Sequence, residues 1–221
     1  MKILVVGASR GIGLEFVRQY RAAGDAVTAT ARSDEGLVRI EALGATALRL
    51  DVASDAGAAA LARSIEGVAF DVIVLNAGVY GPRSQGLQAP TQDEFDAVMH
   101  TNVLGAMRVL PQVVDALAPD AKLAVISSRM ASLALRTSPS GWLYRASKAA
   151  LNSVLKDASL VLHGKATCVA FHPGWVRTDM GGGGADLDVA TSVADMRRTL
   201  AALVPKDNGA YLNHDGAALA W

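Results

Sequence analysis

Short apolar segments and longer stretches of helical spacing alternate along this chain, and this alternation restricts its fold more than any other feature. The apolar segments are KILVV (2–6), AVTAT (26–30), ATALRL (45–50), DVIVL (71–75), KLAVIS (122–127) and ATCVAF (166–171). Because both faces of these segments are apolar, they are typical of strands in a parallel sheet that is covered on both sides. The pattern predicts an α/β fold: a doubly wound, Rossmann-type parallel sheet of about seven strands with helices on both faces.

The length and charge of the chain exclude several other classes. At 221 residues the chain is long enough for one sizeable core, and we expect residues 1–221 to form a single domain. Lys and Arg together number 21, as do Asp and Glu, so we expect neither a nucleic acid nor a membrane as a partner. The first apolar segment is too short for a secretory signal, and no later one is long enough to span a bilayer. These features predict a cytoplasmic protein.

Two stretches of helical spacing are longer than a helix that only packs against the sheet needs to be. They run over roughly 91–117 and 142–163, and both exceed the usual helix length. A run of glycines at 181–184 cannot hold one conformation cheaply. It predicts a mobile loop before a last helix near 189–203.

A glycine-rich turn, GASRGIG, directly follows the first apolar segment and places glycines at 7, 11 and 13. Glycine in such a turn allows a tight bend, a close approach of the backbone to a pyrophosphate, and close packing of helix on strand. The start of the following helix then faces the anion. Three glycines alone are a weak signal, but their place after the first strand of an alternating chain predicts a dinucleotide site.

The end of the second apolar segment indicates which dinucleotide is bound. An acidic residue there would bond the ribose hydroxyls of NAD and repel a 2′-phosphate, but this chain has Ala31 and Arg32 at that point. Arg10, inside the glycine turn, supplies a second guanidinium for a phosphate. Asp34 lies slightly further on and is the one residue that opposes this interpretation. The sequence favours NADP(H) over NAD(H).

Further motifs follow in a fixed order and complete a family pattern. In sequence they are GASRGIG (7–13), DV (51–52), NAG (76–78), Asn102 in HTNVLGAMRV, SS (127–128), YRASK (144–148) and PGWVRT (173–178). Over nearly its whole length the chain resembles the classical short-chain dehydrogenases/reductases. The segment HPGWVRTDMGG and the compact ending DGAALAW are similar to the C-factor and sniffer-like carbonyl reductases. The resemblance also implies that the two long helical stretches pair across a two-fold axis, giving a homodimer or homotetramer.

The resemblance assigns most of the predicted cofactor site. It implies that Asp51 and Val52 hold the adenine, that Asn76 to Gly78 line the ribose side, and that the PGWVRT segment contacts the nicotinamide end. The predicted cofactor-binding residues are Gly7, Ser9, Arg10, Gly11, Ile12, Gly13, Arg32, Asp51, Val52, Asn76, Ala77, Gly78, Tyr144, Lys148, Pro173, Gly174, Val176 and Thr178.

The YRASK segment carries the predicted chemistry. In a helix, Tyr144 and Lys148 lie one turn apart on the same face. Tyrosine ordinarily has a pKa of about 10, and we expect the Lys148 ammonium and an oxidised nicotinamide to lower the pKa of Tyr144. Tyr144 can then serve as the acid in carbonyl reduction and as the base in alcohol oxidation. Lys148 also reaches the nicotinamide ribose.

Two more residues complete the predicted catalytic set. The resemblance implies that Ser128 orients the substrate carbonyl and that Asn102 holds a water in a proton relay with Lys148. Ser127 is an alternative to Ser128, because neighbouring residues at a strand end point in opposite directions and only one can face the site.

Several other residues are weaker candidates. His172 follows a strand and could touch substrate, and Trp142, Met130 and Leu135 could wall the substrate pocket, but packing roles are favoured for all of them. Cys168 is interpreted as an inert core thiol. The four histidines lack the spacing of a metal site, so no metal is expected.

Two hypotheses for function follow from these residues. The leading one is an NADPH-dependent oxidoreductase that transfers a hydride between the nicotinamide and a small carbonyl or alcohol substrate. The alternative is a dinucleotide-binding signalling or regulatory protein whose turnover is incidental. The sequence leaves the substrate and the physiological direction open, because specificity in such folds depends on loops, here 79–90, 129–143 and 179–190.

Overall fold

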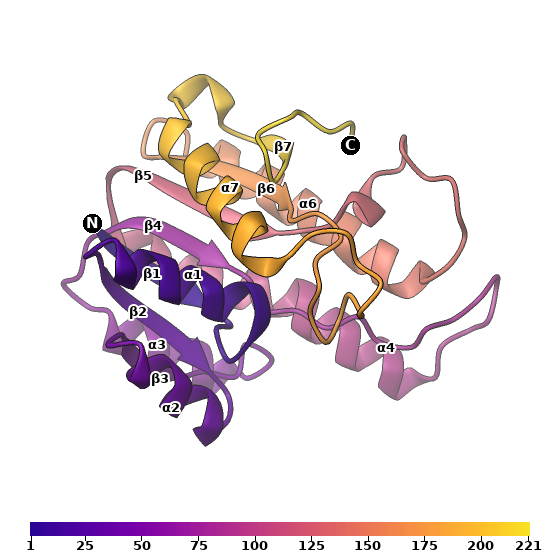
Figure 1. Ribbon diagram of the computed structural model, residues 1–221, viewed down its shortest axis with the longest axis horizontal. Coiled ribbons are helices and arrows are strands. Elements are labelled where there is room, and N and C mark those ends of the chain that lie inside the picture. The colour runs from indigo at the N-terminus through magenta and orange to yellow at the C-terminus, as the bar shows by residue number, and fades with distance from the viewer.

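The computed structural model describes all 221 residues, and its strands form one seven-stranded sheet (Figure 1). The strands are β1 (Lys2–Val6), β2 (Ala26–Ala31), β3 (Thr46–Arg49), β4 (Phe70–Leu75), β5 (Leu117–Ile126), β6 (Ala166–His172) and β7 (Ala210–Asn213). Their order is β3-β2-β1-β4-β5-β6-β7 and every neighbouring pair is parallel. This architecture confirms the predicted doubly wound α/β fold.

Helices cover both faces of the sheet, as the apolar strands require (Figure 1). On one face lie α1 (Gly11–Ala22), α2 (Asp34–Ala42) and α7 (Val189–Ala202), which contribute Phe16, Ile40 and Met196 to one apolar core. On the other face lie α3 (Asp55–Ser64), α5 (Gly105–Val113) and α6 (Trp142–Val161), which contribute Leu61, Val109 and Leu155 to a second core. No helix combines the length and apolar character needed to cross a membrane.

Polar side chains mark the starts of several helices. Ser33 and Asp188 accept hydrogen bonds from the backbone amides of Gly36 and Thr191, at 3.3 and 2.8 Å, and thereby cap α2 and α7. Thr91 begins α4 (Gln92–Met99) with a reciprocal capping box that includes Glu94. Such caps satisfy amides that a helix leaves free at its first turn.

The long helix predicted over 91–117 is not one regular helix. α4 continues into a π-helical turn, His100–Leu104, then into α5 and a short 3-10 turn, Val114–Ala116. A π-helical turn widens the helix by one residue, and such turns are frequent at functional sites. Here the turn contains Asn102. The segment ends in β5, which begins at Leu117 rather than near residue 122.

Two features near the C-terminus differ from the sequence pattern. β7 (Ala210–Asn213) is a short edge strand that no apolar segment marked, and it pairs with β6. The glycine run lies in a loop with its own hydrogen bonds: the Gly182 amide donates to the Thr178 carbonyl at 2.8 Å, and the Trp175 indole donates to the Gly181 carbonyl at 2.9 Å. The segment leading to α7 is therefore tied to the strand end that precedes it.

Candidate active site

A cavity of about 440 Å³ lies at the carboxyl ends of the parallel strands. In doubly wound sheets, ligands bind where the strand order reverses, here between β1 and β4. Of the residues predicted to bind the cofactor, those that line the cavity are Gly7, Ser9, Arg10, Gly11, Ile12, Arg32, Val52, Asn76, Ala77, Gly78, Tyr144, Lys148, Pro173 and Thr178. Gly13, Asp51, Gly174 and Val176 do not line it.

The glycine turn is built so that no side chain intrudes on the cavity floor. Gly7 has φ of +87°, and a Cβ there would lie 2.7 Å from the Cα of Ala77. A Cβ on Gly13 would lie 2.2 Å from the Gly7 carbonyl oxygen. Gly13 therefore acts beneath the cavity, where it allows α1 to pack against the turn. The Asn76 side chain holds the turn by donating to the same carbonyl at 2.6 Å.

The start of α1 faces the cavity and is free of side-chain capping. Arg10 occupies the N-cap position and makes no side-chain hydrogen bond to the first turn. The first-turn amides therefore remain available to an anion, and the helix dipole favours negative charge there. A glycine cradle beside an uncapped helix start fits the diphosphate of a dinucleotide.

The basic residues predicted to bind a 2′-phosphate lie at one edge of this cavity. Arg10 and Arg32 both line it. Asp34 is engaged elsewhere, in an ion pair with Arg49, and Arg49 also donates to the Arg32 carbonyl at 2.7 Å. Asp34 thus has a cationic partner of its own. Arg10 forms an ion pair of 2.7 Å with Asp179, and both side chains are largely exposed.

The adenine side differs from the expectation in one respect. Val52 lines the cavity and packs against Gly105. A Cβ on Gly105 would lie 2.8 Å from the Cγ2 atom of Val52. Asp51 is exposed and its carboxylate accepts a hydrogen bond from the Ala53 amide at 3.0 Å. The Asp51 side chain therefore shapes the turn after β3 and does not border the cavity.

Only some of the residues predicted to contact the nicotinamide end line the cavity. Pro173 and Thr178 line the cavity, whereas Gly174 and Val176 do not. Val176 is buried and forms a parallel bridge with Leu187. Gly174 has φ of +87° and packs close to Leu187 and His214. These two residues hold the loop shape that brings Pro173 and Thr178 to the cavity.

Tyr144 and Lys148 both line the cavity and lie one turn apart on α6. The Lys148 ammonium nitrogen is 5.8 Å from the centre of the Tyr144 ring and donates to the Ile126 carbonyl at 2.8 Å. Both side chains are buried. Helical spacing and the end of β5 therefore place an acid–base side chain and a cation in one small volume.

Burial changes the protonation of both groups. It raises the pKa of Tyr144 to about 12, with the neighbouring Ser128 hydroxyl lowering it in part. It lowers the pKa of Lys148 to about 8. In the free protein the burial of the phenol dominates its pKa, and a lowering by Lys148 together with an oxidised nicotinamide stays a prediction. At neutral pH the phenol is protonated.

The two candidate serines have separate partners. Ser127 lines the cavity, but its hydroxyl donates to the Asn152 side-chain oxygen at 2.5 Å within the core. Ser128 does not line the cavity, yet its hydroxyl is the one that lies beside the Tyr144 phenol. It also accepts a hydrogen bond from the Met130 amide at 3.1 Å. Of the two, Ser128 is the residue positioned to act with Tyr144.

Asn102 lies beneath the cavity in the π-helical turn. Its side chain donates to the Val79 carbonyl and accepts from the Val79 amide, each at 2.8 Å, and it donates to Ser147 at 2.9 Å. A Cβ on Gly78 would lie 3.2 Å from both the Asn102 side-chain oxygen and the Lys148 nitrogen. Asn102 therefore fixes the segment after β4 against the start of α6, close to Lys148.

The family model described as short chain dehydrogenase matches residues 1–185. The chain belongs to the short-chain dehydrogenase family. Its fold and cavity agree with this membership, because the family motifs converge on one site. As a short-chain dehydrogenase it is an oxidoreductase.

Three proteins illustrate what this short-chain dehydrogenase is similar to. It is 35% identical over 158 residues to the C-signal of Myxococcus xanthus, covering 68% of this chain and 92% of that protein. A Burkholderia multivorans structure described as a short-chain dehydrogenase/reductase with bound NADP superimposes with a TM-score of 0.91 at 31% identity, covering 100% and 99% of the two chains. The carbonyl reductase Sniffer of D. melanogaster superimposes with a TM-score of 0.89 at 32% identity, with the same coverage.

Sequence reasoning missed several residues of this short-chain dehydrogenase site. Besides Ala31, Ser127 and Arg177, which lie at positions that the sequence had indicated, the cavity is lined by Thr30, Leu50, Val79, Thr101, Ile126, Asp179, Met180 and Val189. Most lie within a few residues of a recognised motif, and strand ends could have indicated Thr30 and Ile126. Tyr80 was also missed: its ring stacks on Tyr144 with 4.5 Å between the ring centres.

The weaker candidates of this short-chain dehydrogenase lie outside the cavity. Trp142, Met130 and Leu135 do not line it. His172 is mostly buried, its Nδ1 atom has no hydrogen-bond partner, and burial with nearby positive charge lowers its pKa to about 4. Cys168 is buried in the sheet, and burial raises its pKa to about 11, as expected for an inert thiol. No three residues among His, Cys, Asp and Glu lie together as metal ligands would.

Proposed function

We propose that this protein is an NADP(H)-dependent oxidoreductase that transfers a hydride between the nicotinamide and a small carbonyl or alcohol substrate. One observation carries the proposal: Tyr144 and Lys148 line the same cavity as an uncapped helix start, and Ser128 lies beside Tyr144. The dinucleotide supplies the hydride when it is bound. The named relatives support this assignment, since one structure holds NADP and another is a carbonyl reductase.

The preference for NADP(H) rests on the charges at the cavity edge. Arg10 and Arg32 line the cavity at the glycine turn and at the end of β2. Asp34, the residue that opposes NADP, pairs with Arg49. A 2′-phosphate would therefore meet two guanidinium groups and an acid that is already neutralised. We assign the remaining cofactor contacts to the glycine turn, Val52, Asn76 to Gly78, Lys148, Pro173 and Thr178.

In this proposal Tyr144 is the proton donor to the carbonyl oxygen. Its pKa is raised to about 12 by burial, so the phenol carries the required proton at neutral pH. Ser128, beside the phenol, orients the same oxygen. Alcohol oxidation requires the phenolate instead, which this environment disfavours. The protonated phenol is the form that carbonyl reduction requires.

Lys148 and Asn102 return the proton to Tyr144. The Lys148 ammonium lies 5.8 Å from the centre of the Tyr144 ring and is held by the Ile126 carbonyl. Asn102 lies near Lys148 at Gly78 and is fixed by its bonds to Val79 and Ser147. We propose that the two lead a proton inward from water.

The first experiment measures NADPH consumption against a panel of aldehydes, ketones, quinones and diketones, with NADH in parallel. Tyr144→Phe removes the proton donor and is expected to lower turnover by roughly 10²- to 10⁴-fold while dinucleotide binding persists. Tyr20→Phe is the matched control, since Tyr20 is buried on α1 away from the cavity. Equal activity of Tyr144→Phe and wild type would refute the role of Tyr144.

A second candidate function is a dinucleotide-binding signalling or regulatory protein. The similarity to a protein named C-signal favours it. Tight NADPH binding that is unchanged in Tyr144→Phe, with no carbonyl reduced across the panel, would support this alternative. Turnover that depends on Tyr144 would reject it.

We also propose that two or four copies associate through the α4–α5 segment and α6. Phe95, Met107, Leu160 and Val161 expose apolar side chains on these helices. A mass of one chain by light scattering at micromolar concentration would contradict this assembly. The cytoplasmic location and the single-domain character of residues 1–221 stay predictions.

A further inference from the structure

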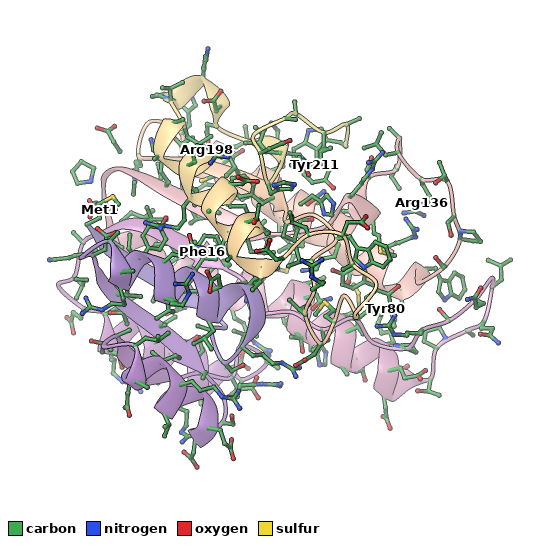
Figure 2. All side chains as sticks on the ribbon, in the orientation of Figure 1. Met1, Phe16, Tyr80, Arg136, Arg198 and Tyr211 are labelled. Carbon is green, nitrogen blue, oxygen red and sulfur yellow. The ribbon has the colours of Figure 1, made fainter.

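Tyr80 covers one side of the proposed proton donor. It lies two residues after Gly78, in the segment that leaves β4. Its ring stacks on the Tyr144 ring with centres 4.5 Å apart and planes inclined by 22°. Figure 2 shows Tyr80 on the side of the molecule where the long loops gather, opposite to Phe16. With this cover, only 7% of Tyr144 is exposed.

Gly141 provides the space that Tyr80 needs. A Cβ at Gly141 would lie 2.5 Å from the Tyr80 hydroxyl oxygen and 3.2 Å from the Met130 methyl carbon. Gly141 also has φ of +66°, in the left-handed region that favours glycine. Its amide donates to the Ser84 carbonyl at 3.1 Å. The segment that carries Tyr80 is therefore attached to the start of α6, one turn before Tyr144.

Arg83 also lies over the Tyr80 ring. Its guanidinium carbon lies 5.3 Å from the centre of the Tyr80 ring. Arg83 also donates to the Met180 carbonyl at 3.0 Å. Tyr80 therefore contacts both Tyr144 and Arg83, and Arg83 connects it to the loop after β6.

This stack fills the space beside Tyr144. The cavity is lined by Val79 and Tyr144, but by no residue from 80–100 or 128–143. Tyr144 therefore borders the cofactor cavity, while the Tyr80 ring occupies the space against the face of the Tyr144 ring.

We infer that Tyr80 determines substrate size in this enzyme, admitting carbonyl compounds with small substituents and excluding aryl and branched ketones. The inference rests on the proposed function. Tyr80 is a specificity-determining residue in this scheme and takes no part in proton transfer. Its ring excludes bulky groups, and Gly141 and Arg83 keep the ring in place.

The test compares two substrates, butanal and 2-acetylnaphthalene, in NADPH-dependent reduction. Tyr80→Ala is expected to raise the ratio of kcat/KM for acetylnaphthalene over butanal by about tenfold or more, because removing the ring opens space for the aryl group. Tyr80→Phe keeps the ring and is expected to keep the wild-type ratio. Arg83→Ala should shift the ratio in the same direction as Tyr80→Ala, but less. A ratio unchanged in Tyr80→Ala would overturn the inference.

A second measurement does not depend on turnover. Nitration by tetranitromethane, mapped by mass spectrometry of peptides, reports how accessible Tyr144 is. Tyr144 should be nitrated faster in Tyr80→Ala than in wild type, while buried Tyr20 in the same sample keeps its rate. If no carbonyl is reduced by wild type, the proposed function fails, and faster nitration still supports Tyr80 as the cover. An unchanged nitration rate would overturn the cover even in an active enzyme.

Discussion

Two sides of the cavity are built in different ways. On the cofactor side, formed by the glycine turn and the ends of β1, β2 and β4, the close contacts involve backbone atoms: a Cβ on Gly13 would meet the Gly7 carbonyl at 2.2 Å. On the substrate side, formed by the loops 79–90, 129–143 and 179–190, the wall beside Tyr144 is made by side chains, as in the Tyr80–Tyr144 stack. Apolar side chains there are also exposed, with Leu87 at 85% and Leu133 at 70%.

This difference explains why cofactor use and substrate choice respond differently to mutation. A backbone that meets another backbone cannot move aside, so the cofactor side accepts few changes. A side-chain wall can be replaced one residue at a time while the sheet behind it stays in place. We therefore expect large effects from small changes on the cofactor side, and graded effects on the substrate side.

The largest expected effect comes from Gly13→Ala on the cofactor side. The added methyl group collides with the Gly7 carbonyl and with the Asn76 side-chain nitrogen, at 2.2 and 2.7 Å. We expect a loss of about 2–3 kcal/mol in the free energy of unfolding, a drop in Tm of roughly 5–10 °C, and a Kd for NADPH at least about 100-fold weaker.

Gly183→Ala on the substrate side is the matched control. No atom lies within 4 Å of a Cβ at this position, so the Tm and NADPH binding should stay near the wild-type values. Thermal unfolding and calorimetric titration with NADPH check both variants. Equal losses in the two would show that the proposed contrast between the sides is absent.

Arg32→Ala tests the charge on the cofactor side without disturbing its backbone. Removing one guanidinium from the 2′-phosphate should weaken NADPH binding by about 10- to 100-fold, the range expected for a hydrogen bond to a charged group. NADH binding should change little, because NADH lacks that phosphate. Titration with the two cofactors measures the ratio; a parallel loss for both would contradict the assigned role of Arg32.

The pH dependence of kcat/KM tests Lys148 and Tyr144, which lie where the cofactor side and the substrate side meet. Lys148 has a pKa lowered to about 8 and Tyr144 a pKa raised to about 12. Reduction needs a charged lysine and a protonated tyrosine, so kcat/KM should be flat near neutral pH and fall by about tenfold per unit above the lysine pKa.

Lys148→Arg serves as the comparison for this profile. Arginine stays charged throughout the range, so the residual activity of that variant should lose the fall near pH 8. A reduction profile that rises between pH 7 and 9 would instead contradict the protonated phenol as the active form of Tyr144.

The smallest effect is expected from Asp179→Asn, which removes the ion pair that joins the two sides. Asp179 and Arg10 are 2.7 Å apart and largely exposed, and exposed pairs contribute little stability. Freeing Arg10 should strengthen NADPH binding by about two- to fivefold, with no change in Tm. Weaker binding in this variant would mean that Asp179 supports the cofactor site and does not compete for Arg10.

The local features of the fold could be predicted from the sequence. The parallel sheet, α6 and α7 were expected near their observed bounds, and the family motifs lie around one cavity. The predictions failed where the local structure or the position of a side chain depends on contacts with distant segments. The π-helical turn at Asn102, the edge strand β7 and the position of the Asp51 side chain away from the cavity are examples.

The sequence by itself determined what depends on neighbouring residues: the alternation of strands and helices, the place of the glycine turn, and the spacing that puts Tyr144 and Lys148 on one helical face. Only the tertiary structure decided that Ser128 and not Ser127 lies beside Tyr144, that Asp34 pairs with Arg49, and that Tyr80 covers Tyr144. The physical reason is the distance along the chain over which each property is determined. Backbone periodicity repeats over a few residues and is written in the local sequence, whereas burial and charge at a site depend on segments brought together from distant parts of the chain.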